Sequence, residues 1–148
     1  MGVSEIKTDL FDSGYFRIKV PTGWMAFLGI DSQCRTTNKT VHVCKGAKLE
    51  TDIFTHACIT VCFYDRQDNY ISPKFIYDNV NDLDAFTLGA YTWNGYTCTS
   101  LGYPYTMLEA DHDGCVFHVM ILMKNGEYEI SLDDEDVKMI LESLTQSN

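Results

Sequence analysis

The chain has 148 residues, of which 45% are hydrophobic and 22% are charged, and this balance is typical of one folded domain spanning residues 1–148. Twenty-one acidic residues against eleven basic ones give a formal net charge of −10 at pH 7, so repulsion opposes binding to nucleic acid and to anionic lipid. No apolar run in the sequence reaches the roughly 18 residues that cross a bilayer, and we therefore expect neither a nucleic-acid partner nor a membrane segment.

The N-terminal sequence has no basic start followed by an apolar stretch, so no secretory leader is expected and the chain as given is predicted to be cytoplasmic. Export is the alternative if a leader has been removed. Cysteines make up about 4% of the chain, well below the content of a disulfide scaffold, and free, mostly buried thiols are therefore expected. Disulfides are the alternative in an exported protein. The six residues are Cys34, Cys44, Cys58, Cys62, Cys98 and Cys115.

The first half of the chain alternates between strand-like runs and turns. Apolar and charged residues alternate over residues 15–20, which predicts a half-buried strand. A Pro-Thr-Gly turn follows, and the apolar run 24–30 predicts a partner strand. Further strands are predicted at residues 40–44 and 56–64, where the same period of two recurs.

The second half contains strong start and turn signals. Ser72 before Pro73 predicts a short helix over 73–80, because serine caps the first amides and proline has no intrahelical bond to lose there. Three dipeptides favour type I′ turns and predict an antiparallel meander. They are Asn94-Gly95, Asp113-Gly114 and Asn125-Gly126. The strands of this meander are expected at 87–93, 96–100, 105–111, 115–124 and 127–132.

The end of the chain combines a buried strand with an amphipathic helix. The run from Cys115 to Met123 is apolar on both faces apart from His118, so a central strand covered on both sides is expected. Apolar residues at the spacing of one helix face then predict a C-terminal helix that covers this strand. They are Val137, Ile140, Leu141 and Leu144. Asp133 is the expected N-cap, with acidic residues in the first turn.

Two stretches resemble one known family. Residues 14–24, Gly-Tyr-Phe-Arg-Ile-Lys-Val-Pro-Thr-Gly-Trp, resemble the strand, proline and Gly-Trp opening of PsbP-like domains. Residues 136–144 are similar to the final helix of that family, with its Ile-Leu-x-Ser-Leu finish. The superfamily includes the photosystem II extrinsic protein PsbP and the Ran-binding Mog proteins, and its members act mainly by binding other proteins.

This resemblance implies a fold and no active site. The implied class is α+β: a curved antiparallel sheet of about six or seven strands flanked by helices, with the C-terminal helix packed on the sheet. No metal or partner residue of the family can be matched position by position in this sequence.

Histidines and cysteines gather on two neighbouring predicted strands. They are His42, Cys44, His56, Cys58 and Cys62. Four such side chains on one face could bind zinc tetrahedrally. Cys58 and Cys62, however, would lie roughly 13 Å apart along a regular strand, too far for one ion. We therefore interpret these residues as packing groups and expect no metal and no other cofactor.

The alternative of a small enzyme depends on a cysteine nucleophile beside histidine, with Cys115 and either His118 or His112 as partners. Such a thiolate needs a cationic neighbour or a helix N-terminus, and the sequence around Cys115 shows neither, since the charged residues nearby are acidic. A carboxylate cluster is a second enzymatic route, but the acidic run 133–136 fits a helix start better. Standard catalytic signatures such as G-x-S-x-G are absent from the sequence. No catalytic residue is assigned, and the chain is predicted not to be an enzyme.

Aromatic residues crowd one third of the chain. The candidate binding residues are Tyr91, Trp93, Tyr96, Tyr103 and Tyr105. Aromatic side chains with a polar tip are enriched at protein interfaces, whereas a cross-strand ladder that only stabilises the hairpins is the alternative. We therefore predict a binding or adaptor module that meets a protein with a basic surface through the sheet or this aromatic region. A homodimer through a self-complementary aromatic face is a further alternative.

Overall fold

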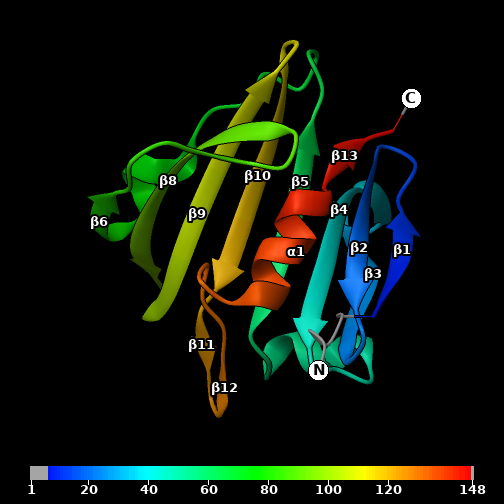
Figure 1. The fold of residues 1–148 in the computed structure, drawn as a ribbon. Helices are drawn as coiled ribbons and strands as arrows, with labels where there is room; N and C mark the ends of the chain where they lie inside the picture. Colours follow the sequence, from blue (N-terminus) through cyan, green and yellow to red (C-terminus); the bar gives the residue numbers. More distant parts are fainter. Residues whose placement is uncertain (1–6, 148) are drawn as a thin grey trace, which may run out of the picture.

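Eight antiparallel strands form the main sheet of this computed structural model, which describes residues 7–147 (Figure 1). From one edge to the other the order is β3-β4-β5-β10-β9-β8-β6, and β7 pairs separately with β8. The strands are β3 (Trp24–Ile30), β4 (Thr36–Lys45), β5 (Cys58–Tyr64), β6 (Asp78–Asp82), β7 (Phe86–Leu88), β8 (Tyr91–Ser100), β9 (Tyr103–His112) and β10 (Cys115–Leu122).

Smaller elements surround this sheet. A three-stranded sheet of order β1-β2-β13 joins segments from both ends of the described chain, and a short hairpin pairs β11 with β12. These strands are β1 (Thr8–Asp12), β2 (Phe16–Pro21), β11 (Lys124–Asn125), β12 (Tyr128–Glu129) and β13 (Thr145–Gln146). The helices are the 3₁₀ helices η1 (Glu50–Phe54) and η2 (Pro73–Ile76) and the α-helix α1 (Glu135–Ser143).

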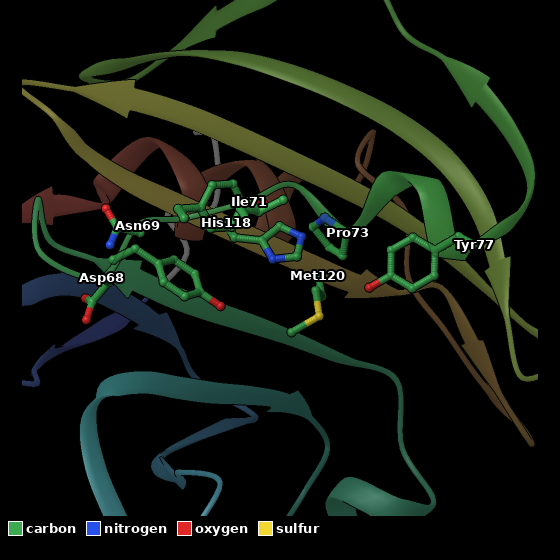
Figure 2. Close-up of a pocket in the computed structure, with 9 residues that line it drawn as sticks. Asp68, Asn69, Ile71, Pro73, Tyr77, His118 and Met120 are labelled. Carbon is green, nitrogen blue, oxygen red and sulfur yellow. The ribbon is translucent and has the colours of Figure 1, made fainter.

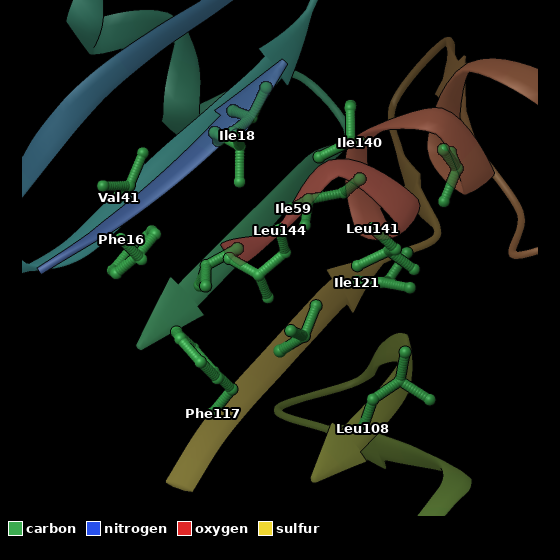
Figure 3. Close-up of a cluster of buried hydrophobic side chains, with 14 of the residues drawn as sticks. Phe16, Ile18, Val41, Ile59, Leu108, Phe117, Ile121, Ile140, Leu141 and Leu144 are labelled. Atoms are coloured by element: carbon green, nitrogen blue, oxygen red, sulfur yellow. The ribbon is translucent and has the colours of Figure 1, made fainter. Parts of the chain in front are cut away.

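The hydrophobic core lies between the large sheet and α1 (Figure 3). Side chains alternate along a strand, so β10 turns Phe117, Val119 and Ile121 toward the helix and its even-numbered residues away from it. The four apolar residues predicted for the helix face, Val137, Ile140, Leu141 and Leu144, are all fully buried in this core. Burying one such side chain stabilises the fold by about 1.5–3 kcal/mol, which fixes α1 on the sheet.

The opposite face of the sheet is crossed by the connection between β5 and β6. This stretch, residues 65–77, contains η2 and is called the crossing segment below. Tyr70 and Ser72 of the segment reach Glu109 on β9, and the Tyr70 ring lies near His118 on β10. The candidate site described below lies between this segment and the sheet.

The α+β class and the antiparallel sheet are confirmed, but three details of the predicted fold are wrong. The main sheet has eight strands rather than six or seven, and α1 is the one α-helix among residues 7–147. The helix predicted over 73–80 ends as the single 3₁₀ turn η2, since β6 then pairs with β8. Ser72 nevertheless caps this turn as expected, with its hydroxyl accepting a bond from the Lys74 amide.

The predicted break at Asn94-Gly95 is also wrong, because β8 runs unbroken through it. Gly95 serves close packing instead: a Cβ there would meet a Leu108 methyl carbon at 2.7 Å. The chain turns at Leu101-Gly102, both with positive φ, which joins β8 to β9. Asp113-Gly114 forms its predicted turn, with both residues at positive φ.

The predictions for the end of the chain need smaller corrections. Strand 127–132 is reduced to β12, which pairs with β11 around Gly126 and Glu127. The N-cap of α1 is Asp134 rather than Asp133. The carboxylate of Asp134 accepts a hydrogen bond from the Ser131 amide at 2.9 Å, which fixes the turn that leads into the helix.

The expectation that all cysteines are free is wrong for two of them. Cys44 and Cys58 are directly opposite on β4 and β5, with Cα atoms 4.2 Å apart, and their sulfur atoms are bonded. Among the other four, Cys62 and Cys98 are buried thiols as predicted, Cys115 is half-buried and Cys34 is exposed. This pairing could not be predicted from the sequence, because the register of β4 on β5 decides which cysteines meet.

Candidate functional site

A polar pair lies on the face of the sheet that is opposite α1. Glu109 of β9 and His118 of β10 are direct cross-strand partners, so their side chains project side by side. They point away from α1, because the neighbouring Phe117 and Val119 pack in the core beneath the helix. The sheet thus holds a carboxylate and an imidazole beside each other under the crossing segment.

Two hydroxyl groups of the crossing segment bind the Glu109 carboxylate. The Oε2 atom accepts hydrogen bonds from the hydroxyls of Tyr70 at 2.6 Å and Ser72 at 2.5 Å. Hydrogen bonds to an ionised carboxylate are stronger than neutral ones, so these two fix the segment to β9. Within residues 7–147 no ion pair includes Glu109, and its negative charge is therefore held by neutral donors.

His118 has an unused ring nitrogen. Its side chain is 3% exposed, and Nε2 has no hydrogen-bond partner in the described part of the chain. Burial lowers the pKa of His118, while the nearby Glu109 carboxylate acts in the opposite direction. A buried polar atom without a partner costs free energy, so this nitrogen marks a place where a ligand would be stabilised.

A cavity of about 290 Å³ opens between the crossing segment and β10, and His118 lines it (Figure 2). The side chains of Tyr64, Tyr70, Tyr77 and Met120 give the cavity a largely aromatic wall. The Tyr64 and Tyr70 ring centroids lie 4.7 Å apart, and those of Tyr70 and His118 lie 5.8 Å apart. Burial raises the pKa of all three tyrosines, so their hydroxyls stay protonated.

One side of the cavity carries a charged group. Asp68 lines the cavity and accepts a 2.9 Å hydrogen bond from Lys39 Nζ, which also donates to Asp65 at 2.9 Å. These two carboxylates raise the pKa of Lys39, and the ammonium in turn lowers the pKa of Asp65. Two acidic groups share one lysine, so this side of the cavity keeps a net negative charge.

The outer surface of the crossing segment is apolar. Ile71, Phe75 and Ile76 are 77%, 81% and 63% exposed. Three large apolar side chains in six residues on a segment tied to the sheet are typical of a protein contact surface. A shallow hollow lined by Phe75, Tyr77 and Val80 adjoins them.

The five aromatic residues predicted to bind a partner are divided between the two faces of the sheet. Tyr91 and Trp93 are buried in the core beneath α1, and Trp93 has no exposed surface. Tyr96 and Tyr105 pack together on the opposite face, and Tyr103 is exposed at the β8–β9 turn. They therefore do not form one surface, and their role in binding stays a prediction.

The predicted cysteine and histidine candidates are likewise separated. Cys115 packs against the core, whereas His118 lies on the other face of the same strand. Cys115 is directly opposite His112, but no hydrogen bond joins their side chains, and the His112 ring contacts Asp113 instead. Among residues 7–147, no three histidine, cysteine or acidic side chains come close enough to hold a common ion.

Sequence reasoning missed most of this site. Ser72 was predicted only as a helix cap, and Glu109, Tyr70, Tyr64 and Tyr77 were not singled out, because the path of the crossing segment over the sheet has no local signature. The one available signal was His118, the single strongly polar residue in an otherwise apolar strand.

The chain has no match among protein-family models and no match among curated proteins. The structure also contains, between residues 7 and 147, no helix long and apolar enough to span a bilayer. The assignment of function below therefore depends on the geometry of the described residues.

Proposed function

We propose that this protein is a non-enzymatic binding module of the PsbP-like type whose partner contacts the crossing segment. The observation that carries the proposal is the exposed apolar surface of Ile71, Phe75 and Ile76 on a segment held to the sheet by Glu109. The order of strands followed by a C-terminal helix is compatible with the resemblance of residues 14–24 and 136–144 to that family.

The attachment of the segment favours binding. Two hydrogen bonds to one carboxylate and the packing of Tyr70 on Tyr64 restrict the segment before any partner arrives. A preorganised surface loses less conformational entropy on association, so more of the contact energy remains for affinity.

Charge favours a basic partner over a second copy of the chain. The net charge of −10 steers cationic surfaces toward the protein and repels another copy of equal charge. Asp68 lines the same cavity as Ile71, where its carboxylate can contact a basic side chain at the rim of an interface.

Site-specific photocrosslinking tests the proposal. A photoreactive phenylalanine analogue is placed at Phe75, and a matched control carries it at Phe54, which is 79% exposed in η1. In an extract of the cells that produce the protein, we expect the Phe75 variant to capture a basic protein at low salt and to lose it at high salt.

Equal capture by the two variants, or capture that salt does not change, would contradict the proposal. A crosslinked product of twice the chain mass would identify a homodimer instead. Fast modification of a thiol near neutral pH in the unmodified protein would favour the enzymatic alternative.

A further inference from the structure

One buried polar group beside the cavity beneath the crossing segment needs a hydrogen-bond partner. His118 Nε2 is buried and has no partner within residues 7–147, and the cavity that His118 lines is large enough for a small organic group. Buried polar atoms in folded proteins almost always have partners. A ligand that forms a hydrogen bond with this nitrogen therefore satisfies a polar group that the described protein atoms leave unsatisfied.

The charges around the cavity determine whether an anion or a cation is favoured as the ligand. Glu109 lies next to His118, accepts hydrogen bonds from the Tyr70 and Ser72 hydroxyls, and forms no ion pair within residues 7–147. Asp68 adds a carboxylate on the open side and shares Lys39 with Asp65. An anion would be repelled by this arrangement, whereas a cation would be attracted.

The walls of the cavity suit an organic cation. The rings of Tyr64, Tyr70 and Tyr77 surround the cavity together with the soft sulfur of Met120. Aromatic rings attract cations through their faces and also pack against the methylene groups of an alkyl chain. A bare metal ion would lack ligands here, because no cluster of metal-binding side chains exists among residues 7–147.

We propose that this cavity binds a primary alkylammonium group, with His118 Nε2 accepting one N–H bond, the tyrosine rings contacting the alkyl chain, and Glu109 and Asp68 supplying the opposite charge. Burial keeps His118 neutral near pH 7 by lowering its pKa, which leaves a ring nitrogen able to accept. A lysine side chain of a basic partner and a free amine both carry this group. Binding of a partner's lysine side chain rests on the proposed function, whereas binding of a free amine does not.

Titration with n-butylammonium chloride tests the cavity without any partner. The ring nitrogen resonances of the four histidines are followed by NMR, and we expect a saturable shift at His118 and none at the half-exposed His112. n-Butanol has the same chain without the charge and is expected to bind at least about tenfold more weakly, because it keeps the alkyl contacts and loses the charge pair.

Variants with matched controls identify the groups involved. Glu109→Gln should weaken n-butylammonium binding about tenfold, while Glu127→Gln in the exposed β11–β12 turn should leave it unchanged. Tyr77→Leu should weaken binding about threefold, and Tyr103→Leu at the β8–β9 turn should not. Thermal unfolding of each variant establishes that it is folded.

The absence of a saturable His118 shift, or equal binding of n-butanol, would overturn the proposal. If Glu109→Gln does not fold, the salt dependence of n-butylammonium binding to the unaltered protein replaces it, and affinity independent of salt would count against the cavity. A capped lysine peptide that binds more tightly than n-butylammonium would identify a side chain as the source, and the reverse order would identify a free amine. If n-butylammonium does not bind but crosslinking at Phe75 succeeds, the proposal for the cavity is refuted and the proposed function is not.

Discussion

Glu109 and His118 are neighbours across β9 and β10, yet between residues 7 and 147 the carboxylate has two hydroxyl partners and the imidazole Nε2 has none. The carboxylate fixes the crossing segment, and His118 lines the cavity between that segment and β10. In the binding mode that we propose, one cross-strand pair thus divides attachment and recognition between adjacent residues.

Removing the Tyr70 hydroxyl should loosen the crossing segment without unfolding the sheet. Tyr70→Phe deletes a hydrogen bond to the Glu109 carboxylate, and bonds to charged groups contribute about 1.5–3 kcal/mol, less where solvent reaches them. We expect faster amide hydrogen exchange in residues 65–77 and little change in β9 and β10. Tyr64→Phe is the matched control, since the Tyr64 hydroxyl forms no hydrogen bond with any of residues 7–147. Equal exchange in both variants would show that the hydroxyl does not hold the segment.

The free energy of unfolding should decrease as the pH is lowered, because two histidines are buried. Burial lowers the pKa of His42 and His118 in the folded state, so the unfolded chain takes up more protons as pH falls below 6.5. The free energy of unfolding in urea should therefore be highest above pH 6.5 and decrease as pH falls toward the folded-state pKa values. His118→Leu should flatten this decrease, because it removes one of the two buried imidazoles. Identical slopes for the two proteins would disprove the assignment.

The disulfide predicts a definite thiol count. With Cys44 bonded to Cys58, the denatured unreduced protein should show four reactive thiols rather than six. Replacing both cysteines by serine should lower the free energy of unfolding by about 3 kcal/mol, the value for closing a loop of roughly 15 residues. Cys98→Ser removes a buried thiol without opening a loop and serves as a control. Six reactive thiols in the isolated protein would contradict the bond.

Alanine substitution at two glycines with positive φ should distinguish backbone strain from steric overlap. Gly89 has φ +67° and Gly102 has φ +84°, but only a Cβ at Gly89 would overlap the backbone carbonyl of Glu142 in α1. Gly102→Ala should therefore cost about 1–2 kcal/mol from strain alone. Gly89→Ala should cost clearly more, because the β7–β8 turn or the helix must also move. Equal midpoints of chemical denaturation for the two variants would show that the β7–β8 turn moves without a measurable cost in free energy.

Local patterns predicted the elements that depend on local physics. The face of α1 follows from four apolar residues at helical spacing, and β10 was recognised as central because both of its faces are apolar. The break predicted at Asn94-Gly95 failed because Gly95 is needed for close packing on Leu108, a demand that local sequence does not reveal. The candidate site could not be predicted for a similar reason, since Tyr70 meets Glu109 across 39 positions of sequence.

The pairing of β2 with β13 links the beginning of the described chain to its end. Thr145 aligns with Arg17, and the Lys19 amide donates to the Ser143 hydroxyl at 2.8 Å across 124 positions. During synthesis on the ribosome, β2 therefore cannot pair with β13 until all the residues between them have emerged. Pairing across so long a stretch of sequence predicts slow folding in which this seam closes late, while the unpaired strands are exposed to aggregation.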